Sequence, residues 1–185
     1  MTAHLIRGDQ VSCSRVGGAM RRESSRLRRH AQALDDALTD LAGPESPDAR
    51  TLAAAMSAAT TSLQALRASA DDLDEAGAAL QRYATDLAEG HEMGRRAELR
   101  VEGAGLLLEG TRVVEPWGPA STQEAERRRS QVPEVQSRVD LATAHVGRAR
   151  GRLEREMTRL TRSFSAHSRA AQSARLAPPL PPRRS

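Results

Sequence analysis

Residues 52–87 decide the fold, and they read LAAAMSAATTSLQALRASADDLDEAGAALQRYATDL. Apolar and small residues recur here at alternating steps of four and three: Leu52, Met56, Ala59, Leu63, Leu66, Ala70, Leu73, Gly77, Leu80, Ala84 and Leu87. This heptad pattern places one apolar stripe along a helix and is typical of packing against another helix in a left-handed coiled seam. We expect its leucines to form the core seam: Leu52, Leu63, Leu66, Leu73, Leu80 and Leu87.

A second apolar stripe precedes this stretch, running from Val16 to Leu41 with similar spacing. It predicts a helix over about residues 9–42, with Asp9 or Ser12 as its N-cap. The helix must end at 43–47, where two prolines and a glycine interrupt the pattern. The next helix is expected over 48–109, although its signal weakens beyond Gly90. Because the linker is short, residues 1–110 should form an antiparallel hairpin.

Residues 111–120 break the pattern with two prolines and the turn motif Trp117-Gly118. Ser121 and Glu124 then have the spacing of a capping box, which predicts a long C-terminal helix over 121–174 packed on the hairpin. Pro133 either kinks this helix or lies in its first turn with Ser130 as the cap. Residues 175–185 read as a disordered Pro/Arg tail, whose alternative role is docking of its Pro-rich segment in an aromatic groove.

The apolar stripe of the last helix changes phase after Leu153. This shift predicts that Met157, Leu160 and Phe164 turn away from the hairpin. They are the candidate partner interface, since a large aromatic among serines and arginines suits a contact anchor. The alternative is that Phe164 only caps the end of the bundle.

Composition supports an all-α fold of long antiparallel helical hairpins in an elongated, coiled-coil-like bundle. Aromatic residues make up only 2% of the 185 residues, so the core must be thin and built from aliphatic side chains. The single cysteine, Cys13, cannot form an internal disulfide. The start of the chain carries Arg7 and Asp9 and lacks a continuous apolar stretch, so we expect no cleavable signal peptide and no membrane span.

The basic charge is concentrated at the two ends of the chain. Residues 1–42 contain 7 arginines against 5 acidic residues, 43–120 contain 7 against 13, and 121–185 contain 14 against 6. Helices that pack on one another would show this complementarity. The alternative is a nucleic-acid or anionic surface on the Arg-rich C-terminal helix.

Side chains that carry chemistry do not form a recognisable motif in the sequence. The five histidines stand singly, without the spacing of paired metal ligands on one helix face. The run Asp71-Asp72-Leu73-Asp74-Glu75 lacks the glycine turn of a calcium loop, and its carboxylates are expected to face solvent or basic neighbours. Glycines at 103 and 105 indicate close packing or a break. We therefore expect no enzyme, no metal, no cofactor and no small-molecule substrate.

Three segments resemble helical-hairpin proteins of actinobacteria in the WXG superfamily of type VII (ESX) secretion. They are residues 8–22, which include Val16-Gly17-Gly18; residues 79–88, which include Tyr83; and residues 116–120, which include Trp117-Gly118. In that family the Trp-containing turn joins the first two helices. The resemblance implies a helical binding module linked to type VII secretion, either cytoplasmic or exported by that system.

These observations favour a non-enzymatic protein that pairs helix-on-helix with itself or with a related helical partner. Nucleic-acid or anionic-surface binding through the C-terminal helix is the alternative function.

Overall fold

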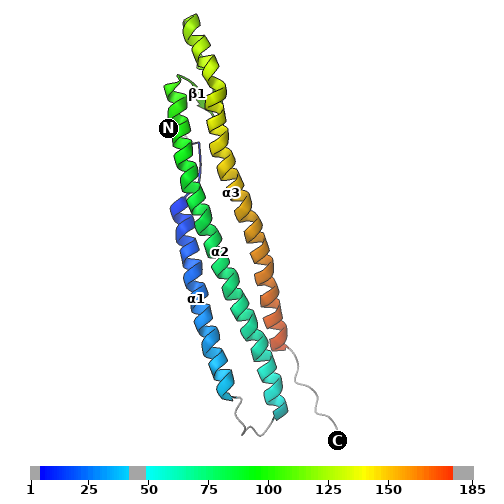
Figure 1. Ribbon diagram of the computed structural model, residues 1–185. Coiled ribbons are helices and arrows are strands. Elements are labelled where there is room, and N and C mark those ends of the chain that lie inside the picture. The colour runs from blue at the N-terminus through cyan, green and yellow to red at the C-terminus, as the bar shows by residue number, and fades with distance from the viewer. Residues whose placement is uncertain (1–4, 42–48, 177–185) are drawn as a thin grey trace. The chain divides into compact units, whose positions relative to one another are not determined.

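The computed structural model describes residues 5–41 and 49–176, and this part of the chain is all-α apart from one small hairpin (Figure 1). The helices are α1 (Gln10–Leu41), α2 (Ala49–Gly103) and α3 (Thr122–Leu176). Strands β1 (Leu107–Glu109) and β2 (Arg112–Val114) lie between α2 and α3. The all-α prediction is confirmed. The expected 43–47 turn and most of the expected Pro/Arg tail lie outside the described residues.

Side-chain caps begin two of the helices where the sequence predicts them. Asp9 is the N-cap of α1, because its Oδ1 accepts hydrogen bonds from the backbone N–H groups of Val11 at 2.9 Å and Ser12 at 3.2 Å. Ser121 caps α3, where its Oγ accepts from the N–H of Glu124 at 3.2 Å. Because α3 begins at Thr122, Pro133 lies inside the helix and not in its first turn.

The C-terminus of α2 differs from the prediction. The helix ends at Gly103, so the expectation of helix to about residue 109 is wrong. Gly105 has a φ of +66°, and its N–H donates to the Glu102 carbonyl at 2.9 Å while the Leu106 N–H donates to the Val101 carbonyl at 3.0 Å. This is the Schellman pattern, with the buried Leu106 and Val101 in the same apolar cluster.

The residues that follow the C-terminus of α2 form an antiparallel β-hairpin, whose turn residues are Gly110 and Thr111. Glu109 pairs with Arg112, and Gly110 has the positive φ, +65°, that a two-residue hairpin turn of this kind requires. The side-chain amide of Gln136 on α3 holds the hairpin, accepting from the Val113 N–H at 2.7 Å and donating to the Thr111 carbonyl at 2.9 Å.

The chain divides into two compact units, and each unit contains parts of more than one helix. Unit 1 comprises Met1–Ser14 and Leu80–Glu154. One of its apolar clusters joins the end of α2 to the hairpin and α3: Ala97, Val101, Ala104, Leu106, Val113, Val135 and Val139. The other joins the N-terminal segment to the same helices: Ile6, Leu87, Ala142 and Val146. Ile6 is thus buried ahead of α1.

Unit 2 comprises Arg15–Ala79 and Arg155–Ser185, and its described core is built mostly from small residues. The buried side chains are Ser24, Ala31, Leu63, Ala65, Ala70, Ala76, Ala79 and Leu160. Small side chains let helix backbones approach closely, so this core is thin, as the low aromatic content predicts. None of the helices in the described ranges combines the length and apolarity needed to span a bilayer.

Candidate functional site

The seam between α1 and α2 in unit 2 is formed by small residues at seven-residue spacing. A Cβ placed on Gly77 would lie 2.6 Å from the backbone oxygen of Gly17, so the two helices are almost in backbone contact there. One heptad along, the fully buried Ser24 donates from its Oγ to the Ala70 carbonyl at 2.7 Å. These contacts run in opposite directions along the two helices. They establish the expected antiparallel packing of α1 on α2.

Arginines of this seam pair with acidic residues on the facing helix. Arg28 donates to Asp71 at 2.9 Å, Arg21 to Asp74 at 3.2 Å, and Arg67 to Asp35 at 2.6 Å. The hydrogen bond to the Asp71 carboxylate is the main cause that raises the pKa of Arg28. Since the pairs are largely solvent-exposed, each contributes little to stability, about 0–1 kcal/mol. Opposite charges placed along a helix seam in this way favour the observed antiparallel alignment.

Four large apolar residues of α1 are less deeply buried than the small residues of this seam. Val16 is 48% exposed and Leu34 is 37% exposed, while Met20 and Leu27 between them are half-buried. We call these four residues the α1 apolar row. By contrast, Ala31 is 1% exposed. It continues the row of small seam residues on α1, Gly17, Ser24 and Ala31, which we call the small-residue row. Helix α1 therefore packs on α2 through its small side chains and leaves its large ones partly accessible to solvent.

The predicted interface on α3 is only partly at the surface. Phe164 is 44% exposed and Met157 is half-buried, but Leu160 is 4% exposed and belongs to the core of unit 2. The prediction that Leu160 turns outward is wrong, because the apolar row of α3 keeps its phase. The heptad step that connects Val139, Val146 and Leu153 leads on to Leu160 and then to His167.

The polar His167 follows Leu160 in this heptad row, and it contacts two other polar side chains. The ring Nε2 of His167 lies 3.5 Å from Asp72 Oδ2 on α2 and 3.1 Å from the Oγ of Ser163. The Asp72 side chain is only 12% exposed, and its Oδ2 has no hydrogen bond in the described structure. A serine–histidine–aspartate relay needs the acid and the serine on different ring nitrogens. Here both approach Nε2, so this arrangement does not form that relay.

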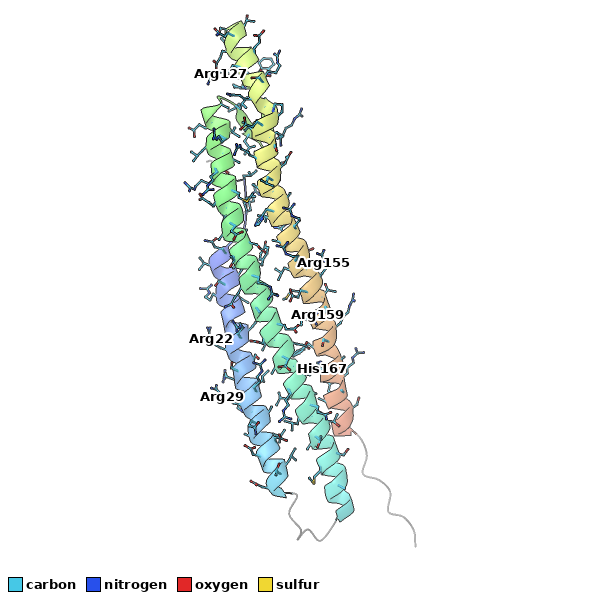
Figure 2. All side chains as sticks on the ribbon, viewed as in Figure 1. Arg22, Arg29, Arg127, Arg155, Arg159 and His167 are labelled. Carbon is cyan, nitrogen blue, oxygen red and sulfur yellow. The ribbon has the colours of Figure 1, made fainter. Side chains whose placement is uncertain are left out.

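A second contact holds the same part of α3 to α2. Arg159, labelled in Figure 2, donates to the Glu75 carboxylate. This hydrogen bond is the main cause that raises the pKa of Arg159. Both side chains are more than half exposed. Asp71, Asp72, Asp74 and Glu75 thus all lie close to basic side chains. The sequence predicts that this acidic run faces either solvent or basic neighbours, and much of it faces basic neighbours.

The predicted core leucines of α2 lie at different depths. Leu63 and Leu87 are buried, at 3% and 0% exposure. Leu66, Leu73 and Leu80 are half-buried. The side chain of Leu52 lies outside the described residues.

The turn motif lies between β2 and α3 and is open to solvent. The Trp117 side chain is fully exposed, and Gly118 has a φ of +146°.

Sequence reasoning found only part of the seam between α1 and α2: Leu63, Ala70 and Gly77 stand in the predicted stripe of α2, whereas Gly17 and Ser24 of α1 were missed. Gly17, Ser24 and Ala31 repeat every seven residues on α1, as do Leu63, Ala70 and Gly77 on α2. That repeat was the available signal, but glycine and serine carry little weight in a search for apolar stripes. Comparisons with protein-family models, with curated proteins and with solved structures found no match to this chain.

Proposed function

We propose that this protein is a helix-binding module that pairs with a second copy of itself or with a related helical protein. The observation that carries the proposal is the α1 apolar row, whose large side chains are left partly exposed while small ones fill the α1–α2 seam. A helix that packs through small residues keeps a second, apolar side for another helix. Residues at four- and seven-residue steps are the anchors that an amphipathic helix uses in such contacts.

Charge on α1 suits a helix partner. Arg21 and Arg28 are engaged with Asp74 and Asp71 inside unit 2, so these charges are already compensated. Arg22 and Arg29 point away from α2 in Figure 2 and stay in solvent. The apolar row can thus be covered without burying these four guanidinium groups, which would otherwise oppose association.

Sedimentation velocity over a concentration series tests pairing with a second copy. We expect the average mass of the native chain to rise toward that of a dimer. Replacing Val16→Glu and Leu34→Glu together should weaken association by more than about thirtyfold, since burial of two new charges costs more than about 2 kcal/mol. The control is Leu99→Glu with Leu141→Glu, which alters two residues of unit 1 that are each 56% exposed. A native chain that stays monomeric throughout would contradict self-pairing.

Phe164 is a second candidate anchor in unit 2. Its 44% exposure supports a role in contacting a partner, whereas Leu160 is buried in the core of unit 2. Phe164→Ala should weaken association without loss of helix content by circular dichroism. Leu160→Ala should instead lower stability, by about 2–5 kcal/mol.

The link to type VII secretion is a separate part of the proposal, and it is supported by the resemblance of residues 8–22, 79–88 and 116–120. It implies that the protein acts in the cytoplasm beside such a system or is exported by it. Expression in a host with and without a functional type VII system tests this, with the chain measured in the culture medium. Equal amounts in both media would contradict export by that route.

One observation favours the alternative function, binding to nucleic acid or another polyanion. Arg155 and Arg162 lie seven residues apart on α3, are exposed, and form no ion pair within the described part of the chain (Figure 2 labels Arg155). Such a row can contact phosphates. Salt dependence distinguishes it from helix pairing.

A further inference from the structure

Three potential metal ligands converge in unit 1, on the side where α2 faces α3. Asp86 and Glu89 are one turn apart on α2, and His145 projects from α3. Their ligand atoms all lie within 4.8 Å of one another. The His145 Nε2 atom lies 3.7 Å from Glu89 Oε2. The proposed helix-binding surface in unit 2 uses none of these residues.

We propose that Asp86, Glu89 and His145 bind a divalent transition-metal ion of the zinc type, which links α2 to α3. One imidazole and two carboxylates form a ligand set that suits zinc, whereas calcium and magnesium favour oxygen ligands alone. Ligand atoms bound at about 2.0–2.2 Å in a tetrahedron are roughly 3.4 Å apart. The pair at 3.7 Å must therefore contract by about 0.3 Å, and the other pairs, which lie within 4.8 Å, by about 1.4 Å or less.

The positions of the three side chains allow that contraction. Asp86 and His145 are held between the helices, at 25% and 23% exposure, and so need little reorganisation. Glu89 is 62% exposed, and its side chain is free to rotate toward the other two. Three protein ligands would leave a fourth position for water or for a group from a partner.

Two existing contacts compete with the metal. Arg152 donates to Asp86 Oδ2 at 2.9 Å, and His145 Nε2 lies 3.2 Å from the backbone carbonyl of Asp86. Metal binding at Nε2 would replace the contact with the carbonyl, and the arginine would compete with the metal ion for the carboxylate. Arg152 therefore lowers the affinity of the site for the metal ion, and removing its charge should strengthen metal binding.

Isothermal titration of the full chain with Zn²⁺ tests the site. We expect one ion per chain and a rise in melting temperature, because an ion that bridges the helices stabilises the folded state. His145→Gln keeps an amide that can donate to the Asp86 carbonyl but removes the ligand, so affinity should fall at least about tenfold with helix content unchanged. Asp86→Asn should act similarly. Arg152→Gln should raise affinity by a few-fold.

Matched histidine variants separate this site from adventitious binding. His91→Gln alters a half-buried histidine on α2 of the same unit, and His167→Gln alters the one beside Asp72. Both variants should bind Zn²⁺ like the native chain. Equal binding by His145→Gln and the native chain would overturn the proposal, as would an affinity lost in all three histidine variants alike. Absence of a saturable site would also overturn it.

Discussion

Gly77 shows how a single missing side chain sets the distance between two helices. An added Cβ would lie 2.6 Å from the Gly17 backbone oxygen, which cannot move aside as a flexible side chain would. Gly77→Ala should therefore lower the free energy of unfolding by about 1–3 kcal/mol, as overpacking does elsewhere. Urea denaturation monitored by circular dichroism measures the change.

Gly147 provides the control for this substitution. It lies within α3, where an added Cβ meets nothing within 4 Å. Gly147→Ala should raise the free energy of unfolding by about 0.5–1 kcal/mol, since alanine is the better helix former. Equal effects of the two substitutions would show that helix propensity, and not the close approach, governs position 77.

Glu92 offers a residue-level test by titration. The hydrogen bond from Arg95, followed by that from Arg96, lowers the pKa of the Glu92 carboxyl below its ordinary value. A carboxyl with a lowered pKa stabilises the folded state above its unfolded pKa, and this contribution is lost as pH falls through the folded value. Arg95→Ala should raise the pKa of Glu92, as measured by NMR of the carboxyl carbon. Arg100→Ala, two turns further along α2, should leave it unchanged.

At the scale of elements, two neighbouring glycines at the end of α2 should respond in opposite ways to the same substitution. Gly105 holds a φ of +66°, which costs an alanine about 1–2 kcal/mol, whereas a Cβ on the helical Gly103 meets nothing within 4 Å. Gly105→Ala should lower the free energy of unfolding by about 1 kcal/mol or more. Gly103→Ala should be neutral or stabilising in the same denaturation experiment. Destabilisation by Gly103→Ala alone would contradict the observed helix end.

The three helices could be predicted from the sequence, because long periodic stripes and polar caps such as Asp9 and Ser121 are local signals. The β-hairpin could not be predicted, because each of its strands has only three residues, too few to show an alternating pattern. Its anchoring depends on Gln136, more than twenty residues away. The burial of Leu160 could not be predicted, because Met157 and Phe164 indicate a new phase in the sequence, whereas in the structure the row continues from Leu160 to the polar His167.

The candidate sites were harder to predict than the helices. Exposure of Val16 and Leu34 depends on which stripe of α1 meets α2, and the small residues Gly17 and Ser24 settle this through close backbone approach. The Asp86, Glu89 and His145 cluster joins residues from two helices, so spacing along one helix does not reveal it. Both features depend on tertiary packing.

For the molecule as a whole, ionic strength distinguishes the two proposed modes of binding. Pairing through the α1 apolar row rests on removal of apolar surface from water, which salt leaves intact or strengthens. Binding of a polyanion by Arg155 and Arg162 releases counterions, so its affinity falls steeply as salt rises. We expect self-association of the native chain to persist from about 50 to 500 mM salt, because the screened charges contribute little to it. Sedimentation across that range measures the association, and fluorescence anisotropy with a labelled DNA duplex measures polyanion binding. Arg155→Gln with Arg162→Gln should leave self-association unchanged, whereas Val16→Glu with Leu34→Glu should weaken it by more than about thirtyfold at every salt concentration. If instead the duplex binds tightly at low salt, and the arginine pair lowers the slope of log affinity against log salt by about 2, the alternative function is the correct one.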